Sequence, residues 1–104
     1  MALDAKLFSE CADWIAEQLT NEYQGFISAE FIEAVMIFER EFRDAAGDPG
    51  LPHATVIPLL FRKLSEDEGV PTGWAGLSPV LLDEILHMED EFMSLAGSPR
   101  NIRR

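Results

Sequence analysis

The sequence contains two similar segments fifty residues apart, and this internal repeat constrains the fold more than any other feature. Residues 27–49 align without a gap on residues 77–99, with seven identical positions. The identical pairs are Ser28/Ser78, Glu39/Glu89, Glu41/Glu91, Phe42/Phe92, Ala46/Ala96, Gly47/Gly97 and Pro49/Pro99. A repeat of this kind sets the architecture, so we expect each half of the chain to form the same supersecondary unit.

Each copy predicts a helix with both ends marked. A serine stands at the N-cap, where its hydroxyl can accept from a free N–H of the first turn. A glycine fits the left-handed position after the last turn, and a proline two residues later prevents continuation. These residues are Ser28, Gly47 and Pro49 in the first copy and Ser78, Gly97 and Pro99 in the second. The pattern predicts helices over residues 29–46 and 79–96.

The apolar residues of these two helices recur at helical spacing and predict one buried stripe on each. The stripes comprise Phe31, Val35, Phe38, Phe42 and Ala46, and Leu81, Ile85, Met88, Phe92 and Ala96. A second apolar row, formed by Ile32, Met36, Leu82 and Leu86, makes each stripe wider than a surface helix requires. Either these two helices lie centrally against several neighbours, or the second row is an interface. We predict that it is a partner-binding surface, which a homodimer could use.

Two further helices are predicted before the repeated ones, over residues 4–22 and 56–67, with Thr55 as an N-cap and Pro58 at the third helical position. The expected fold is all-α: four helices as two tandem helix–loop–helix repeats packed about a pseudo-twofold. We expect residues 1–99 to form a single domain, with halves 1–50 and 51–99. Residues 100–104 would be a basic C-terminal tail.

The formal net charge of −11 disfavours nucleic acid and anionic membranes as partners and favours basic proteins. The single cysteine, Cys11, lies in an apolar helical pattern that predicts a buried, inert thiol. The first residues lack the features of a secretion signal, and no apolar run approaches the ~20 residues of a membrane span. We expect a cytoplasmic protein.

No pattern in the sequence predicts catalysis or a cofactor, and we expect no enzyme activity. Glu84 and His87 have a spacing used by di-iron helical bundles, but the first repeat has Ala34 and Ile37 at the matching positions. The loop before residue 28 also lacks the carboxylates of a calcium-binding loop. One weak metal candidate remains on the last helix, formed by Asp83, His87 and Glu91.

These observations favour a small acidic protein–protein interaction module, an adaptor or regulator. The predicted partner-binding residues are Ile32, Met36, Trp74, Leu82 and Leu86. One alternative is an acidic inhibitor or immunity-like protein that mimics nucleic acid, which requires the carboxylates to form one continuous surface. These carboxylates are Glu10, Asp13, Glu17, Glu39, Glu41 and Asp44, or their repeat partners. The other alternative is a helical protein that binds a divalent metal.

Overall fold

A computed structural model describes residues 5–23, 25–72 and 76–103, and these residues form an all-α fold. The elements are α1 (Ala5–Tyr23), α2 (Ala29–Ala46), α3 (His53–Arg62), the π-helical turn η1 (Lys63–Asp67) and α4 (Pro79–Leu95). The described residues contain no strand. None of their helices is both long and apolar enough to cross a membrane.

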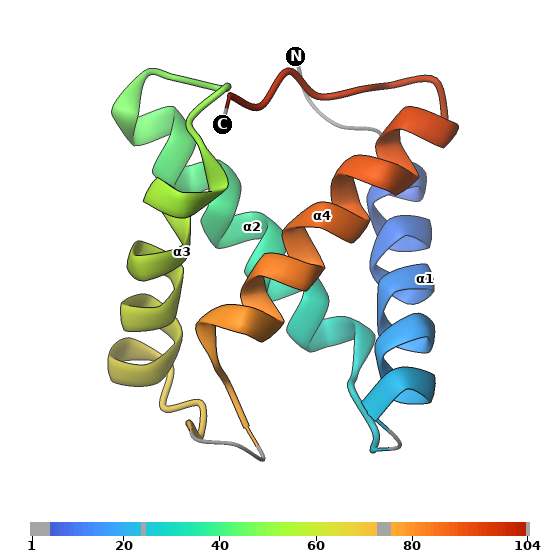
Figure 1. Cartoon of the computed structure of the whole chain (residues 1–104), viewed down its shortest axis with the longest axis vertical. Coiled ribbons are helices and arrows are strands. Elements are labelled where there is room, and N and C mark those ends of the chain that lie inside the picture. The colour runs from blue at the N-terminus through green and yellow to red at the C-terminus, as the bar shows by residue number, and fades with distance from the viewer. Residues whose placement is uncertain (1–4, 24, 73–75, 104) are drawn as a thin grey trace.

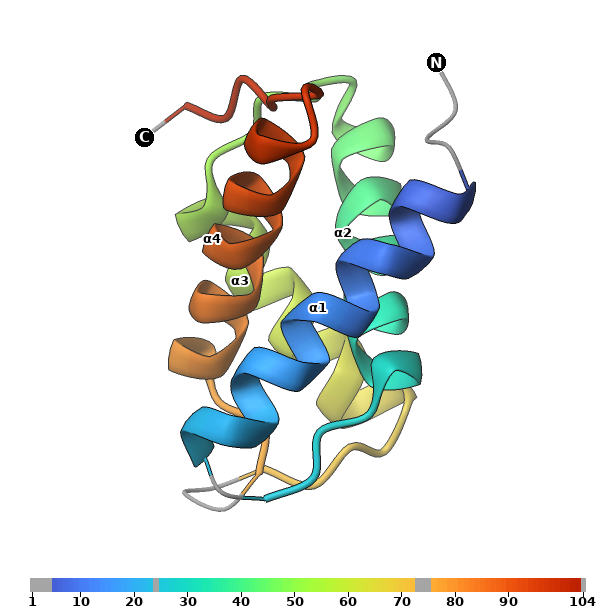
Figure 2. The same ribbon diagram turned by 90° about the vertical axis from the view of Figure 1, so that its right-hand side faces the viewer.

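Helices α2 and α4 cross at the centre of the molecule, and the two other helices flank them (Figure 1, Figure 2). Helix α1 packs against both central helices on one side, and α3 packs against both on the other. The pairs α1–α2 and α3–α4 form the two expected helix–loop–helix units, which confirms the all-α, four-helix prediction. The twofold rotation between the units stays a prediction.

The ends of α2 follow the predicted capping residues. The Ser28 hydroxyl accepts from the Phe31 N–H at 3.2 Å and closes the first turn. At the other end Gly47 has φ of 65°, and the Asp48 N–H donates to the Arg43 carbonyl at 3.0 Å. This is the Schellman arrangement, in which a left-handed residue lets the chain turn back and satisfy a terminal carbonyl. The helix has the predicted bounds.

The two ends of helix α4 are capped as those of α2 are, and its C-terminal end comes one residue earlier than predicted. The Ser78 hydroxyl accepts from the Leu81 N–H at 3.1 Å. Gly97 has φ of 82°, and the Ser98 N–H donates to the Met93 carbonyl at 2.8 Å. The same local chemistry therefore begins and ends both central helices.

The burial of side chains is also the same in both central helices. Position by position, residues 31–47 and 81–97 fall in the same classes of exposure. The buried positions are 32, 35, 36, 39 and 43 in α2 and 82, 85, 86, 89 and 93 in α4. The prediction of the buried stripe of α2 was therefore wrong in its centre. Phe31, Phe38 and Phe42, which were predicted to form it, are only half-buried and lie beside the buried positions. The deepest line instead contains the charged residues Glu39, Arg43 and Glu89.

Helix α3 begins earlier than predicted. Its first residue is His53, with Pro52 at the N-cap, so the predicted start at Thr55 is wrong. Pro58 is consequently the sixth helical residue and not the third, and its missing N–H removes one hydrogen bond within the helix. The ring lies on the exposed side of α3, where the neighbouring backbone can bond to water instead.

The last described residues return across one end of the fold, at the top of Figure 1. The Arg103 N–H donates to the Gly50 carbonyl at 2.9 Å, and the Arg103 guanidinium pairs with Asp48. A Cβ on Gly50 would lie 2.6 Å from the Asn101 carbonyl oxygen, so only glycine allows this approach. The C-terminal segment 98–103 therefore packs against the domain, and the predicted basic tail begins within this segment.

Candidate functional site

The helical residues predicted to bind a partner lie in the interior. Ile32, Met36, Leu82 and Leu86 are all 0% exposed within the single chain. They fill the space between the crossing helices and present no surface to another molecule, so the prediction of a partner or homodimer surface at these positions is wrong. The fifth predicted residue, Trp74, lies outside the described residues.

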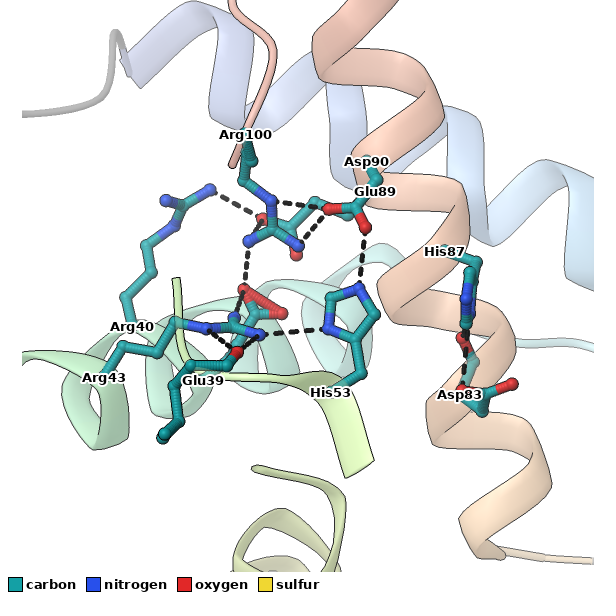
Figure 3. Close-up of polar contacts among 10 residues, drawn as sticks. Glu39, Arg40, Arg43, His53, Asp83, His87, Glu89, Asp90 and Arg100 are labelled. Carbon is teal, nitrogen blue, oxygen red and sulfur yellow. Dashed lines mark hydrogen bonds and ion pairs between the residues drawn. The ribbon is translucent and has the colours of Figure 1, made fainter. Parts of the chain in front are cut away.

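The weak metal candidate on α4 is not assembled. His87 Nδ1 lies 3.3 Å from Asp83 Oδ1, and both side chains are exposed (Figure 3). Glu91 is exposed as well, but no group of three or more metal-ligating side chains that could hold an ion forms within the described ranges. The His87 ring instead stands edge-on to the His53 ring, with 5.1 Å between their centroids.

The carboxylates required for nucleic-acid mimicry are divided between surface and interior. Glu39 and its repeat partner Glu89 are both 0% exposed, so neither can contribute to an acidic surface. The exposed members of the set are Glu10, Asp13, Glu17, Glu41 and Asp44. The predicted mimicry surface is wrong at the repeated glutamates, which have a different role.

Glu39 and Glu89 form the centre of a network that we call the buried charge cluster (Figure 3). It combines side chains from α2, α3, α4 and the C-terminal segment. Its members are Glu39, Arg40, Arg43, His53, Glu89, Asp90 and Arg100. Sequence reasoning missed this cluster, although Glu39 and Glu89 are identical in the repeat and continue the spacing of the buried positions before them.

Arg100 joins the acidic members of the cluster. Its Nη1 pairs with Glu39 Oε1 and lies 3.3 Å from Glu89 Oε2, while its Nε donates to Asp90 Oδ1 at 2.7 Å. Burial acts to lower the pKa of Arg100, but the charges of Glu39 and Glu89 outweigh burial and raise it. Arg100 is therefore a fixed cation that holds the C-terminal segment against both central helices.

The surroundings of Glu89 favour the protonated form of its carboxyl group. Burial, followed by the negative charge of Glu39, raises the pKa of Glu89 well above its usual value. Glu39 Oε2 and Glu89 Oε1 are buried and have no hydrogen-bond partner in the described part of the chain, which adds to the cost of keeping both groups ionised.

The partners of His53 fix its tautomer. Arg43 Nη2 lies 3.0 Å from His53 Nδ1, and because a guanidinium can only donate, Nδ1 is the acceptor. His53 Nε2 then carries the proton and donates to Asp90 Oδ2 at 2.6 Å. Burial acts to raise the pKa of Asp90, but the hydrogen bond from His53 and the charge of Arg100 outweigh it and lower the pKa.

The chemistry of the cluster is structural. Its two glutamates are fully enclosed, and its guanidinium groups are already paired with carboxylates. A cavity of about 300 Å³ lies beside Arg40, Arg43 and Arg100, but their charges are compensated within the chain. The nearby thiol of Cys11 is fully buried, as predicted, and burial followed by the charge of Glu89 raises its pKa to about 12.

Replacing Glu89 by Gln is expected to make the stability of the protein less dependent on pH. A raised carboxyl pKa contributes stability that is fully present below the ordinary value of 4.5 and is lost as the pH rises from there through the raised pKa. Each unit of the shift corresponds to about 1.4 kcal/mol. Urea unfolding at about pH 5 and about pH 7 should show a smaller decrease in Glu89→Gln than in the parent. An unchanged decrease would contradict the raised pKa of Glu89. Glu91→Gln, at an exposed position of α4, is the control.

The opposite end of the fold, at the bottom of Figure 1 and Figure 2, carries an apolar groove. We call it the loop-end groove; its volume is about 670 Å³, and side chains from both inter-helix loops and the adjoining helices line it. The apolar and aromatic lining residues are Tyr23, Phe26, Phe31, Val70, Leu77 and Leu81. Phe26 is 85% exposed, so a large aromatic ring stands in solvent at the groove.

Two acidic residues adjoin Tyr23, which lines this groove: Glu22 precedes it in α1, and Glu84 accepts from its hydroxyl. The Tyr23 hydroxyl, which lines the groove, donates to Glu84 Oε1 at 3.0 Å. Partial loss of hydration, followed by the negative charge of Glu84, raises the pKa of Glu22 above its usual value. Glu84 Oε2 is buried and has no hydrogen-bond partner among the described atoms. The groove therefore combines apolar walls with negative charge at its rim.

No protein-family model, curated protein or solved structure matches this chain.

Proposed function

We propose that the protein is a non-catalytic protein–protein interaction module, an adaptor or regulator, and that it binds its partner through the loop-end groove. The single observation that carries this proposal is Phe26, which is 85% exposed beside an apolar groove of about 670 Å³. A large aromatic side chain left in water beside apolar walls is typical of an interaction site.

The composition of the groove supports a protein partner. Aromatic side chains are enriched among the residues that dominate binding energy, and Tyr23, Phe26 and Phe31 all line this groove. Side chains of an extended segment of another protein fit between the two loops and cover Phe26. The net charge of −11 opposes nucleic acid phosphates at the same surface.

A cytoplasmic location belongs to the same proposal. Cys11, the single cysteine of the chain, cannot form an intrachain disulfide. Its fully buried thiol, with a pKa of about 12, is in the form that persists in a reducing compartment.

Replacing Phe26 by Ser is expected to weaken binding of the partner by about thirtyfold or more, because a hot-spot aromatic contributes about 2 kcal/mol or more. The measurement is quantitative retention of proteins from the native cell extract by the immobilised parent and variant. The matched control is Leu95→Ser, since Leu95 is also exposed, at 80%, but does not line the groove.

The two variants should unfold at the same temperature as the parent, because neither side chain is buried. A partner retained equally by Phe26→Ser and by the parent would show that binding occurs elsewhere. A partner lost equally from both variants would indicate general adhesion of exposed apolar residues, and would also contradict the proposal.

A further inference from the structure

We infer that the loop-end groove accepts a segment in which a Lys or Arg adjoins an apolar anchor, with the cation paired to Glu22 and Glu84. This inference rests on the proposed function and specifies the chemistry of the partner. The anchor would occupy the apolar walls beside Phe26 and Phe31. Its basic neighbour would then lie at the rim, where Tyr23 connects the groove to Glu84.

In the described part of the chain, the carboxylates of Glu22 and Glu84 have no positively charged side chain paired with them, unlike the close acidic groups of the buried charge cluster. The negative charge of Glu84 acts on Glu22, and neither carboxylate forms an ion pair among the described residues. In the buried charge cluster, by contrast, Arg100 and Arg43 pair with Glu39, and Arg40 pairs with Glu89. Two close carboxylates without a cation repel each other, so a positive charge at the rim is favourable.

Glu84 also provides a specific acceptor for this cation. One of its oxygens is occupied by the Tyr23 hydroxyl at 3.0 Å. The other, Oε2, is enclosed and has no donor among the described residues. The Glu84 side chain as a whole is only partly buried, so a Lys or Arg of a partner can pair with this carboxylate from the solvent side. The rim thus favours a donor with positive charge over a neutral apolar segment.

A second copy of this chain is a poorer occupant than a basic partner. Each Lys and Arg of the described residues already forms an ion pair within the chain. Two copies would also each bring a net charge of −11 to the contact. Charge complementarity therefore favours a segment of a different, basic protein, and steers its approach.

The test uses a displayed library of random dodecapeptides as the probe. Peptides are selected on the intact protein and then depleted on Phe26→Ser, which leaves those that require the groove. Enrichment of Lys or Arg next to an aromatic or aliphatic residue is the expected result. If the groove-dependent peptides are not enriched in Lys or Arg, the inference is overturned and the proposed function remains. The same holds if these peptides match sequences of this chain. If no peptide depends on Phe26, the proposed function itself fails.

A selected peptide then tests the pairing directly. Glu84→Gln and Glu22→Gln are each expected to weaken its binding about two- to fivefold, the range of an exposed ion pair, and less at high salt. The losses should vanish when norleucine replaces the basic residue of the peptide. Asp13→Asn is the matched control, because it removes one charge from an exposed position of α1. An equal loss in Asp13→Asn would mean that only net charge attracts the peptide, and would overturn the pairing.

Discussion

Replacing Arg100 by Ala is expected to lower the free energy of unfolding by about 3–5 kcal/mol, the typical cost of removing one partner from a buried ion pair. The Arg100 side chain is 12% exposed and pairs with Glu39, Glu89 and Asp90. Without it, Glu39 and Glu89 keep two buried carboxyl groups close together with less positive charge between them. Urea unfolding at neutral pH measures the loss, which is a large part of the ~5–15 kcal/mol of a typical domain.

Arg103→Ala is the matched control for this change. Arg103 also lies in the C-terminal segment and pairs with Asp48, but its side chain is 60% exposed. An exposed ion pair contributes at most about 1 kcal/mol, so Arg103→Ala should be nearly neutral. If Arg100→Ala were no more destabilising than Arg103→Ala, the cluster would be open to water and the C-terminal segment would not be held by Arg100.

The helices were predictable because their signals are local. Ser28 and Ser78 cap, and Gly47 and Gly97 terminate, through hydrogen bonds to residues within five positions of themselves. The repeat then doubled each signal, so both central helices could be predicted within one residue. Helix α3 was predicted less well, because Pro58 was taken as a first-turn residue although α3 extends five residues before it.

The buried charge cluster could not be predicted from apolar spacing. Glu39 and Arg43 lie on the buried line of α2, but a hydrophobic pattern assigns charged residues to the solvent face. Their burial depends on partners distant in sequence, since Arg100 and Glu39 are 61 residues apart. Arg100 itself looked like part of a basic tail. The identity of Glu39 and Glu89 in the two copies is not enough, because Glu41 and Glu91 are identical too and are exposed. The signal was that 39 and 89 also continue the spacing of the buried positions before them.

The loop-end groove was hidden for a similar reason. The inter-helix loops carry no regular spacing, and the walls of the groove come from both halves of the chain, from Phe26 and Phe31 to Val70 and Leu81. The sequence suggested an excess of apolar residues, but it indicated the wrong ones. The row at Ile32 and Leu82 fills the interior, and the exposed aromatic residue is Phe26 in the loop.

Replacing Ile32 by Asp is expected to unfold the protein. Ile32 is 0% exposed in the core between the helices, and an aspartate there must either bury an unpaired charge or bind a proton at a cost in free energy. The lost apolar contacts add about 2–5 kcal/mol by analogy with large-to-small core changes. The combined cost is comparable to the ~5–15 kcal/mol that stabilises a domain. Far-ultraviolet circular dichroism should show loss of helix and no cooperative transition.

Ile37→Asp is the matched control on the same helix, because Ile37 is 45% exposed and its charge can stay in water. We expect this variant to retain the parent's helical content and a cooperative transition, with a change in stability within about 1 kcal/mol. Sedimentation separates the remaining alternative. If Ile32→Asp kept its helices and differed from the parent only in mass, Ile32 would lie in an interface between chains, as the apolar spacing alone suggested. The burial of Ile32 within one chain instead requires the two aspartate variants to differ in folding and not in assembly.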